Sequence, residues 1–113
     1  MNNKIALGTA QFGLDYGISN TLGKTSEKEV SKILDLAIQK GISLIDTAQA
    51  YGSSEEIIGN HHQNRFNIIT KLNSHLLLKY SANQLINESL KKLKLKSIYG
   101  VLFHSLSILS IDL

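Results

Sequence analysis

The stretch Ile42-Ser43-Leu44-Ile45-Asp46-Thr47-Ala48 is a short apolar run that contains an acidic residue near its end. Three other strand-like runs occur along the chain, at residues 5–10, 66–72 and 97–104. Each of the first three runs is followed by a segment in which apolar residues recur at helical spacing. This alternation of strand-like and helix-like segments is typical of a parallel sheet whose strands are connected by helices.

Start and stop signals predict where the connecting helices lie. Three serines are each followed, three residues later, by a glutamate or a glutamine: Ser26, Ser53 and Ser81. A serine with this spacing caps the first turn of a helix, because its side chain accepts a hydrogen bond from a backbone amide that has no partner inside the helix. Gly41 predicts the end of the first of these helices.

Two architectures share this pattern, an open doubly wound sheet and a segment of a closed barrel, and periodicity alone does not separate them. Three of the runs end in or near an ionisable side chain, at Asp46, Lys71 and His104, and barrel enzymes carry their chemistry at the carboxyl ends of the strands. The glycines after the first run fit neither the G-x-G-x-x-G nor the P-loop spacing. We therefore predict one α/β domain over residues 1–113 and favour a segment of a closed parallel barrel over an open sheet.

Composition narrows the class of protein. The chain has no cysteine, which excludes a disulfide framework and thiolate chemistry and favours a cytoplasmic location. No apolar run is long enough for a signal peptide or a membrane span, so no membrane partner is expected. The net charge is +3, with a lysine cluster at Lys91, Lys92, Lys94 and Lys96. No aromatic residue lies among these lysines, so we interpret them as a solvated helix face and expect no nucleic-acid partner.

Four side chains are candidates for catalysis: Asp46, Tyr51, Lys71 and His104. Neighbouring parallel strands present their carboxyl ends on one side, so these residues can meet there. A tyrosine donates a proton poorly at neutral pH unless a nearby cation stabilises its phenolate, and Lys71 can be that cation. Asp46 can keep Lys71 charged, and His104 can orient a substrate oxygen. The set suits protonation of a carbonyl oxygen, with a nicotinamide cofactor as the hydride source.

The motifs around these residues resemble a known family. The segment Ile45-Asp46-Thr47-Ala48-Gln49-Ala50-Tyr51-Gly52-Ser53-Ser54-Glu55 is similar to the signature of the aldo-keto reductases. Residues 69–72 and 101–105 resemble the family's third and fourth strands, with their lysine and histidine, and residues 7–13 resemble its first strand and loop. The four motifs occur in the family's order and cover nearly the whole chain.

The resemblance implies NADPH-dependent reduction of an aldehyde or ketone to an alcohol, with a small-molecule carbonyl substrate. By this resemblance Tyr51 is the general acid, Lys71 activates it, Asp46 pairs with Lys71, and His104 positions the carbonyl group. Thr9 and Asp46 are implied to lie beside the nicotinamide ribose. No metal site is predicted, and His61, His62 and His75 are interpreted as surface residues.

A barrel of this family needs eight strands and about 250 residues. The resemblance therefore implies a half-barrel with about the first four βα units of a parallel (β/α)8 TIM barrel, and residues 1–113 are expected to be the N-terminal part of a longer domain. Two alternatives stay open: an inactive remnant or half-barrel that needs a complementary chain, and a small partner-binding scaffold. We expect Ile45, Ile69 and Leu102 to point into the barrel interior. Unpaired outer strands associate with other chains, so the purified chain is expected to self-associate and to reduce no carbonyl by itself.

Overall fold

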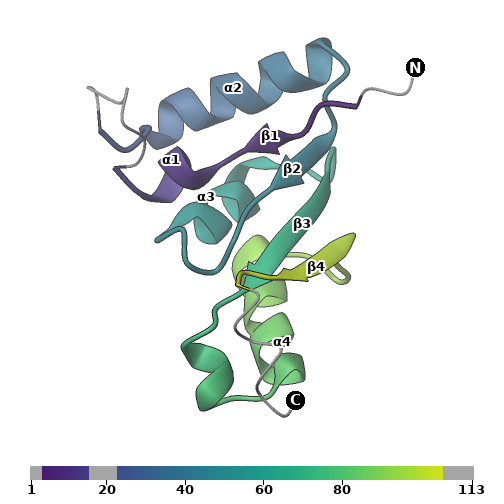
Figure 1. Ribbon diagram of the computed structural model, residues 1–113. Helices are drawn as coiled ribbons and strands as arrows, with labels where there is room; N and C mark the ends of the chain where they lie inside the picture. Colours follow the sequence, from purple (N-terminus) through teal and green to yellow (C-terminus); the bar gives the residue numbers. More distant parts are fainter. Residues whose placement is uncertain (1–3, 16–22, 106–113) are drawn as a thin grey trace.

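The computed structural model describes residues 4–15 and 23–105 of the chain. Within these ranges four parallel strands form one sheet in the order β1-β2-β3-β4 (Figure 1). The strands are β1 (Leu7–Gly8), β2 (Leu44–Asp46), β3 (Asn67–Leu72) and β4 (Gly100–Phe103). Sequential parallel pairing with intervening helices is the arrangement of consecutive βα units of a barrel, so the predicted half-barrel is confirmed.

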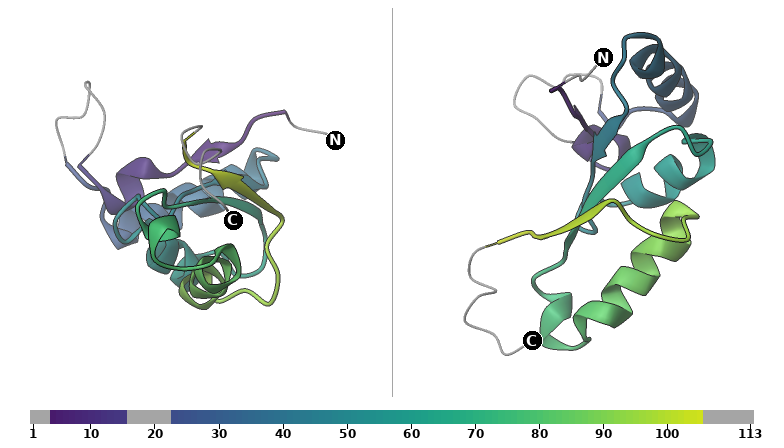
Figure 2. Two further views of the ribbon diagram at one scale, coloured as in Figure 1. Left: turned by 60° about the horizontal axis from the view of Figure 1, so that its bottom comes forward. Right: turned by 90° about the vertical axis from the view of Figure 1, so that its right-hand side faces the viewer.

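Helices occupy the connections between the strands. They are α1 (Ala10–Gly13), α2 (Glu27–Gln39), α3 (Ser54–His61) and α4 (Ala82–Leu93), with the short 3₁₀ helix η1 (Leu76–Leu78) before α4. The three longer helices lie on the same side of the sheet, as the right-hand view of Figure 2 shows. The first strand-like run is shorter than predicted, because Ala10 begins α1 instead of extending β1.

No helix in residues 4–15 or 23–105 is both long enough and apolar enough to cross a membrane.

The predicted helix signals hold at two of the three serines. The Ser81 side chain accepts from the Gln84 amide, and the Gln84 side chain accepts from the Ser81 amide, which completes a capping box. Ser26 accepts from the Glu29 amide at 3.3 Å. Ser53 precedes α3 but forms no side-chain cap, because its backbone lies outside the extended conformation that directs a capping side chain at the helix. After α2, Gly41 has φ +79, as the predicted helix end requires.

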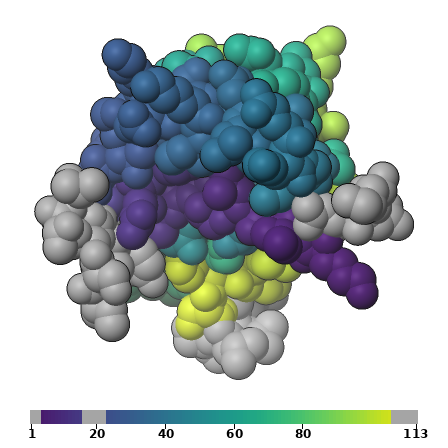
Figure 3. Space-filling view, turned by 90° about the horizontal axis from the view of Figure 1, so that it is seen from above, coloured from purple at the N-terminus to yellow at the C-terminus, as the bar shows by residue number. Residues whose placement is uncertain are grey.

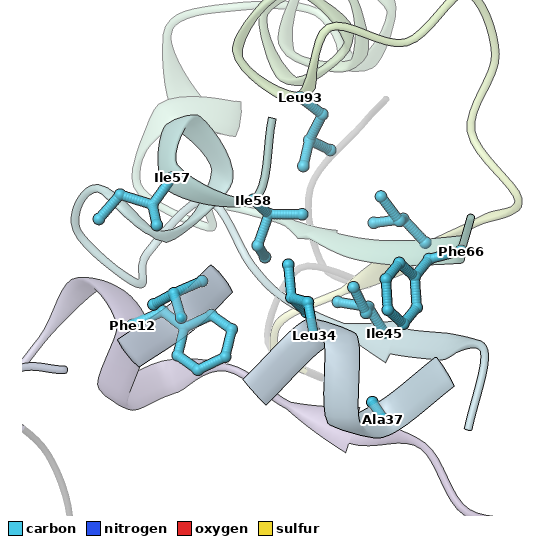
Figure 4. Packing of buried hydrophobic residues seen from close by; sticks show 10 residues of the cluster. Phe12, Leu34, Ala37, Ile45, Ile57, Ile58, Phe66 and Leu93 are labelled. Atoms are coloured by element: carbon cyan, nitrogen blue, oxygen red, sulfur yellow. The ribbon is translucent and has the colours of Figure 1, made fainter. Parts of the chain in front are cut away.

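The hydrophobic core lies between the sheet and the three longer helices. Ile45 and Ile68 of the sheet are 0% and 1% exposed, and they belong to the same buried cluster as Leu34 of α2 and Ile58 of α3. Figure 4 shows Leu34, Ile45 and Ile58 close together between their elements. Apolar burial stabilises a fold by roughly 25 cal/mol per Å², so this face of the sheet provides most of the stability.

Alternate residues of the strands point away from the helices, toward the inner face of the predicted barrel. In β3, Ile68 and Thr70 are buried against the helices, whereas Ile69 and Lys71 are only partly buried. In β4, Leu102 is 51% exposed and is the register partner of Lys71. The expectation that Ile45 points into the barrel is wrong, because Ile45 alternates with Asp46 and packs against the helices.

The prediction that His62 is a surface residue is also wrong, because His62 is only 4% exposed. Its Nε2 atom lies 2.8 Å from the carbonyl oxygen of Leu93, and its Nδ1 atom accepts from the Asn64 amide at 2.8 Å. A carbonyl only accepts and an amide only donates, so the ring is neutral with its hydrogen on Nε2. His62 therefore connects the end of α3 to the end of α4.

Candidate active site

Lys71 is the centre of a polar cluster at the end of the sheet where the strands have their carboxyl ends, which we call the mouth. Its Nζ atom lies 2.8 Å from Oδ1 of Asp46, 3.1 Å from the carbonyl oxygen of Thr47 and 3.5 Å from Oη of Tyr51. The Lys71 side chain is 17% exposed and the Asp46 side chain 38%. The ammonium group is thus largely removed from water, while Asp46 keeps an accessible carboxylate surface.

His104 follows directly after β4 and completes the group of four candidates at the mouth. Its ring lies edge-to-face against the ring of Tyr51, with centroids 5.9 Å apart and an interplanar angle of 85°. The residue is exposed. The structure therefore brings Asp46 of β2, Tyr51 of the loop after β2, Lys71 of β3 and His104, just after β4, to one place.

Two glycines explain how the loop after β2 places Tyr51. A Cβ atom on Gly13 would overlap the carbonyl oxygen of Tyr51 and the backbone nitrogens of Ser53 and Ser54. Gly52 has φ +56, and a Cβ atom there would overlap the carbonyl oxygen of Gly13. The backbone of α1 therefore packs directly against the backbone of the Tyr51 loop, and only glycine allows this approach.

Beneath the Asp46–Lys71 pair lies a cluster of three buried hydroxyl groups, from Thr9, Thr47 and Ser54, each at most 1% exposed. Ser54 Oγ lies 3.0 Å from Thr47 Oγ1 and 3.1 Å from Thr9 Oγ1. Thr9 Oγ1 donates to the carbonyl oxygen of Asp46 at 2.9 Å. The cluster holds residues 46–47 in place, and these residues supply two of the oxygen atoms around Lys71 Nζ, Oδ1 of the Asp46 side chain and the backbone carbonyl oxygen of Thr47.

The sequence interpretation gave no role to Ser54 or Thr47. The only available signal was their place in the quoted motif, because burial of a hydroxyl cannot be read from a single sequence. Thr9, which the resemblance implied to lie beside the nicotinamide ribose, has a hydroxyl that is buried and already donates to Asp46. A Thr9 contact with a cofactor stays a prediction, and its visible contribution is to hold Asp46.

Two more polar residues that the sequence interpretation missed anchor the same loop on the helix side. Gln49 donates to the carbonyl oxygen of Leu85 and to Ser89 Oγ, both at 2.8 Å, and accepts from the Asn73 amide. Glu55, in the first turn of α3 just after the loop, is 2% exposed and accepts from Thr70 Oγ1 at 2.8 Å. The loop that carries Tyr51 is therefore hydrogen-bonded to β3 and to α4.

A cleft of about 480 Å³ lies beside β1 and includes Gly8, Asp46 and Tyr51 in its lining. A Cβ atom on Gly8 would have nothing within 4 Å, so the space above this strand is open. A larger cleft, about 600 Å³, lies between η1 and α4 on the helix side. The smaller cleft is the better candidate for a ligand site, since it adjoins the Asp46–Lys71 pair.

The residues at the smaller cleft fit a nicotinamide ribose. Asp46 has one carboxylate oxygen bonded to Lys71, and its exposed surface offers acceptor capacity to a sugar hydroxyl group. Among residues 4–15 and 23–105, no group of three or more histidine or carboxylate side chains is arranged to hold a metal ion.

A model of the aldo/keto reductase family matches residues 4–107 of the chain. The chain belongs to the aldo/keto reductase family. The solved structures that this chain resembles include several aldo/keto reductases. A Pseudomonas aeruginosa protein assigned to these reductases is 31% identical with a TM-score of 0.75, and the match covers 95% of this chain and 46% of that one.

Two structures of family members contain a nicotinamide cofactor. A Bombyx mori aldo-keto reductase in complex with NADP is 30% identical, with a TM-score of 0.59 over 83% of this chain and 31% of that one. A Klebsiella pneumoniae aldo-keto reductase in complex with NADPH is 21% identical, with a TM-score of 0.67 over 88% of this chain and 34% of that one, and shows the fold alone. This chain spans less than half the length of these solved relatives. A comparison with curated proteins gives no match.

Proposed function

We propose that the chain carries the proton-donating side of an NADPH-dependent carbonyl reductase site, which reduces an aldehyde or ketone to an alcohol. The observation that supports this best is the position of Lys71, whose Nζ atom contacts both Asp46 Oδ1 and Tyr51 Oη. A phenol beside an ammonium group, which is itself held by a carboxylate, is suited to give up a proton.

Tyr51 acts as the general acid in this proposal. As its proton moves to the carbonyl oxygen of the substrate, negative charge develops on Oη. The Lys71 ammonium group, 3.5 Å away, stabilises that charge. Asp46 keeps the ammonium group charged and in place through the 2.8 Å ion pair. General acid catalysis of this kind contributes roughly 10²–10⁴-fold to a rate.

His104 positions the substrate. Its ring lies roughly perpendicular to the ring of Tyr51 and the residue is exposed at the mouth, so a ring N–H can donate to the same oxygen that receives the Tyr51 proton. A carbonyl oxygen held between two donors has its reacting carbon directed away from them, toward the inside of the mouth. Orientation of this kind lowers the barrier without new covalent chemistry.

Asp46 would hold the ribose of the cofactor through its accessible carboxylate surface, with Thr9 holding Asp46 from below. A bound nicotinamide supplies the hydride, because protein side chains cannot. The NADP and NADPH complexes of the relatives from Bombyx mori and Klebsiella pneumoniae support this choice of cofactor.

The proposal applies to a closed barrel. The described strands form four of the eight that a barrel of this class contains, so part of the wall of the mouth comes from outside them. We expect the 113-residue chain alone to show no NADPH-dependent reduction, and a barrel that includes it to be active.

A chimera tests the proposed function. Residues 1–113 replace the matching 46% of the Pseudomonas aeruginosa relative, and NADPH oxidation is measured with a panel of aldehydes and ketones. Tyr51→Phe should lower kcat/KM by at least about 100-fold, since only the proton donor is lost. Tyr99→Phe is the matched control, because Tyr99 is 65% exposed and lies before β4, away from the mouth.

Circular dichroism and NADPH titration of both variants separate loss of chemistry from loss of folding or binding. Normal folding, near-normal NADPH affinity and lost turnover in Tyr51→Phe would support the proposal. A folded chimera that reduces no carbonyl, or turnover that survives Tyr51→Phe, would contradict it.

A further inference from the structure

The cleft of about 600 Å³ on the helix side takes no part in the proposed reduction. Its lining includes Gln49 of the loop after β2, Glu55 of α3, Tyr80 after η1 and Lys92 of α4. The helices η1 and α4 lie at the end of the molecule opposite α2 (Figure 1). Figure 3 shows that other end, where α2 (blue) lies beside the segment of β1 and α1 (purple). Among the described residues, the cleft is therefore built from the connections between β2 and β4, not from the outer strands of the sheet.

The carboxylate of Glu55 has one oxygen atom without a partner. Glu55 is 2% exposed, and its Oε2 atom accepts from Thr70 Oγ1 at 2.8 Å. Within residues 4–15 and 23–105, its Oε1 atom forms no hydrogen bond and the carboxylate forms no ion pair. Every fully buried side-chain nitrogen or oxygen atom in the same ranges does have a partner. Oε1 is therefore not sealed off, and it reaches the cleft that Glu55 lines.

A carboxylate that is buried to this extent is costly unless a cation or several hydrogen bonds replace its lost hydration. The single hydroxyl group of Thr70 serves Oε2 alone. Lys91 also lines the cleft, but its Nζ atom lies 3.5 Å from Oε1 of Glu88 at the surface. A cationic group that enters the cleft would supply the partner that Glu55 Oε1 lacks.

The rest of the lining suits a short apolar body. Leu76 and Tyr80 line the cleft and are 37% and 50% exposed. The Gln49 side chain already uses both of its donor hydrogens and its oxygen atom in other contacts. We propose that the cleft binds a small primary ammonium compound, whose ammonium group donates to Glu55 Oε1 and whose apolar chain lies against Leu76 and Tyr80.

The chemistry of the site favours an ammonium group over other cations. A guanidinium group pairs best with both oxygen atoms of a carboxylate, and Oε2 of Glu55 is occupied by Thr70. A quaternary ammonium group has no N–H to donate. A metal ion would need further histidine or carboxylate ligands, and the described residues contain no such group of three.

The cleft lies behind the strand that carries Lys71. Glu55 holds Thr70, the residue before Lys71, and the backbone amide of Gln49 donates to the carbonyl oxygen of Lys71 at 3.1 Å. The side chains of Thr70 and Lys71 point to opposite faces of the sheet. The ammonium compound would therefore bind on the helix side of β3, at a site distinct from the mouth.

Equilibrium dialysis of the 113-residue chain against isopentylammonium tests the site, with the bound compound quantified by mass spectrometry. Isopentyl alcohol is the control ligand, because it keeps the apolar chain and lacks the charge. We expect uptake of the ammonium compound to saturate at one molecule per chain. The alcohol should bind at least about 10-fold more weakly, because a hydrogen bond to an ionised group is stronger than one between neutral groups.

Two adjacent glutamates provide matched variants. Glu55→Gln and Glu56→Gln remove the same charge from the first turn of α3, but Glu56 is exposed and lies outside the lining of the cleft. Glu55→Gln should weaken binding at least about 10-fold, and Glu56→Gln less than about twofold. Tyr80→Ala leaves the contact between Glu55 and Thr70 intact and should weaken binding at least about threefold, through lost apolar contact. Circular dichroism verifies that each variant is folded.

Leucine as a third ligand distinguishes an amino acid from a simple amine. Lys92 lines the cleft and forms no ion pair with another described residue, so its ammonium group is available to a carboxylate. Leucine binding at least as tight as that of isopentylammonium would identify an amino acid as the ligand. Weaker binding of leucine would identify an amine without a carboxylate, and both results support the ammonium site at Glu55.

Three results would overturn the proposal. They are uptake of isopentylammonium that does not saturate, equal binding of the ammonium compound and the alcohol, and equal affinities of folded Glu55→Gln and Glu56→Gln. If Glu55→Gln does not fold, unchanged binding by Tyr80→Ala would also overturn it. None of these readouts depends on turnover, so the proposed carbonyl reduction can fail while this site holds, and the reverse.

Discussion

The two faces of β3 differ in what they do. Ile68, Thr70 and Leu72 point toward the helices and are at most 2% exposed, whereas Ile69 and Lys71 point the other way and are partly exposed. Side chains of a strand alternate between faces, so neighbouring residues in the sequence belong to different environments. One face of the sheet holds the fold together and the other carries the candidate chemistry.

The largest difference between the two faces of β3 is expected at two neighbouring isoleucines. Ile68→Ala should lower the free energy of unfolding by about 2–5 kcal/mol, because Ile68 fills the core between sheet and helices. Ile69→Ala should lower the free energy of unfolding by less than about 1.5 kcal/mol, because Ile69 is only partly buried and its side chain has fewer contacts to lose. Urea denaturation of the two variants measures both losses. Equal losses would show that the two faces do not differ.

A second pair of variants compares the stability effect of a methyl group at two glycines, one where α1 packs against the Tyr51 loop and one on the open side of β1. Gly13→Ala forces a methyl group into the backbone of the Tyr51 loop and should destabilise the fold by about 1–3 kcal/mol. Gly8→Ala, where a Cβ atom meets nothing within 4 Å, should be nearly neutral. Thermal unfolding measures both. A neutral Gly13→Ala would mean that α1 does not hold the loop.

The smallest stability effect is expected from neighbouring serines. Ser54→Ala removes the centre of the buried hydroxyl cluster and should cost about 1 kcal/mol, together with a lower kcat for the chimera, since residues 46–47 lose a support. Ser53→Ala removes only a contact with Lys24 at the surface and should change neither quantity. If the two variants behave alike, the cluster does not position Lys71.

The sequence predicted the four strands and the three longer helices in order, since apolar periodicity and capping serines are local signals, but it did not predict α1 or η1. It predicted the four mouth residues because they lie at or after the carboxyl ends of strands, and the structure brings them together. Their catalytic roles stay predictions.

What the sequence did not predict depends on tertiary contacts. The direction of Ile45 was wrong because an apolar strand residue fits either face of a sheet covered on both sides. His62 was assigned to the surface because nothing local shows that the carbonyl oxygen of Leu93, 31 positions away, lies beside it. The Ser54 cluster was missed for the same reason. Residues 106–113 lie outside the described residues.

The most direct test of the central claim is the coupling between Tyr51 and Lys71 in the chimera. Tyr51→Phe, Lys71→Met and the double variant are compared with the unaltered chimera in kcat/KM for one aldehyde. If the two side chains act as one proton-donating unit, each single variant loses at least about 100-fold, and the double variant loses no more than the worse single one. Losses that multiply would show that Tyr51 and Lys71 act independently and would contradict the account.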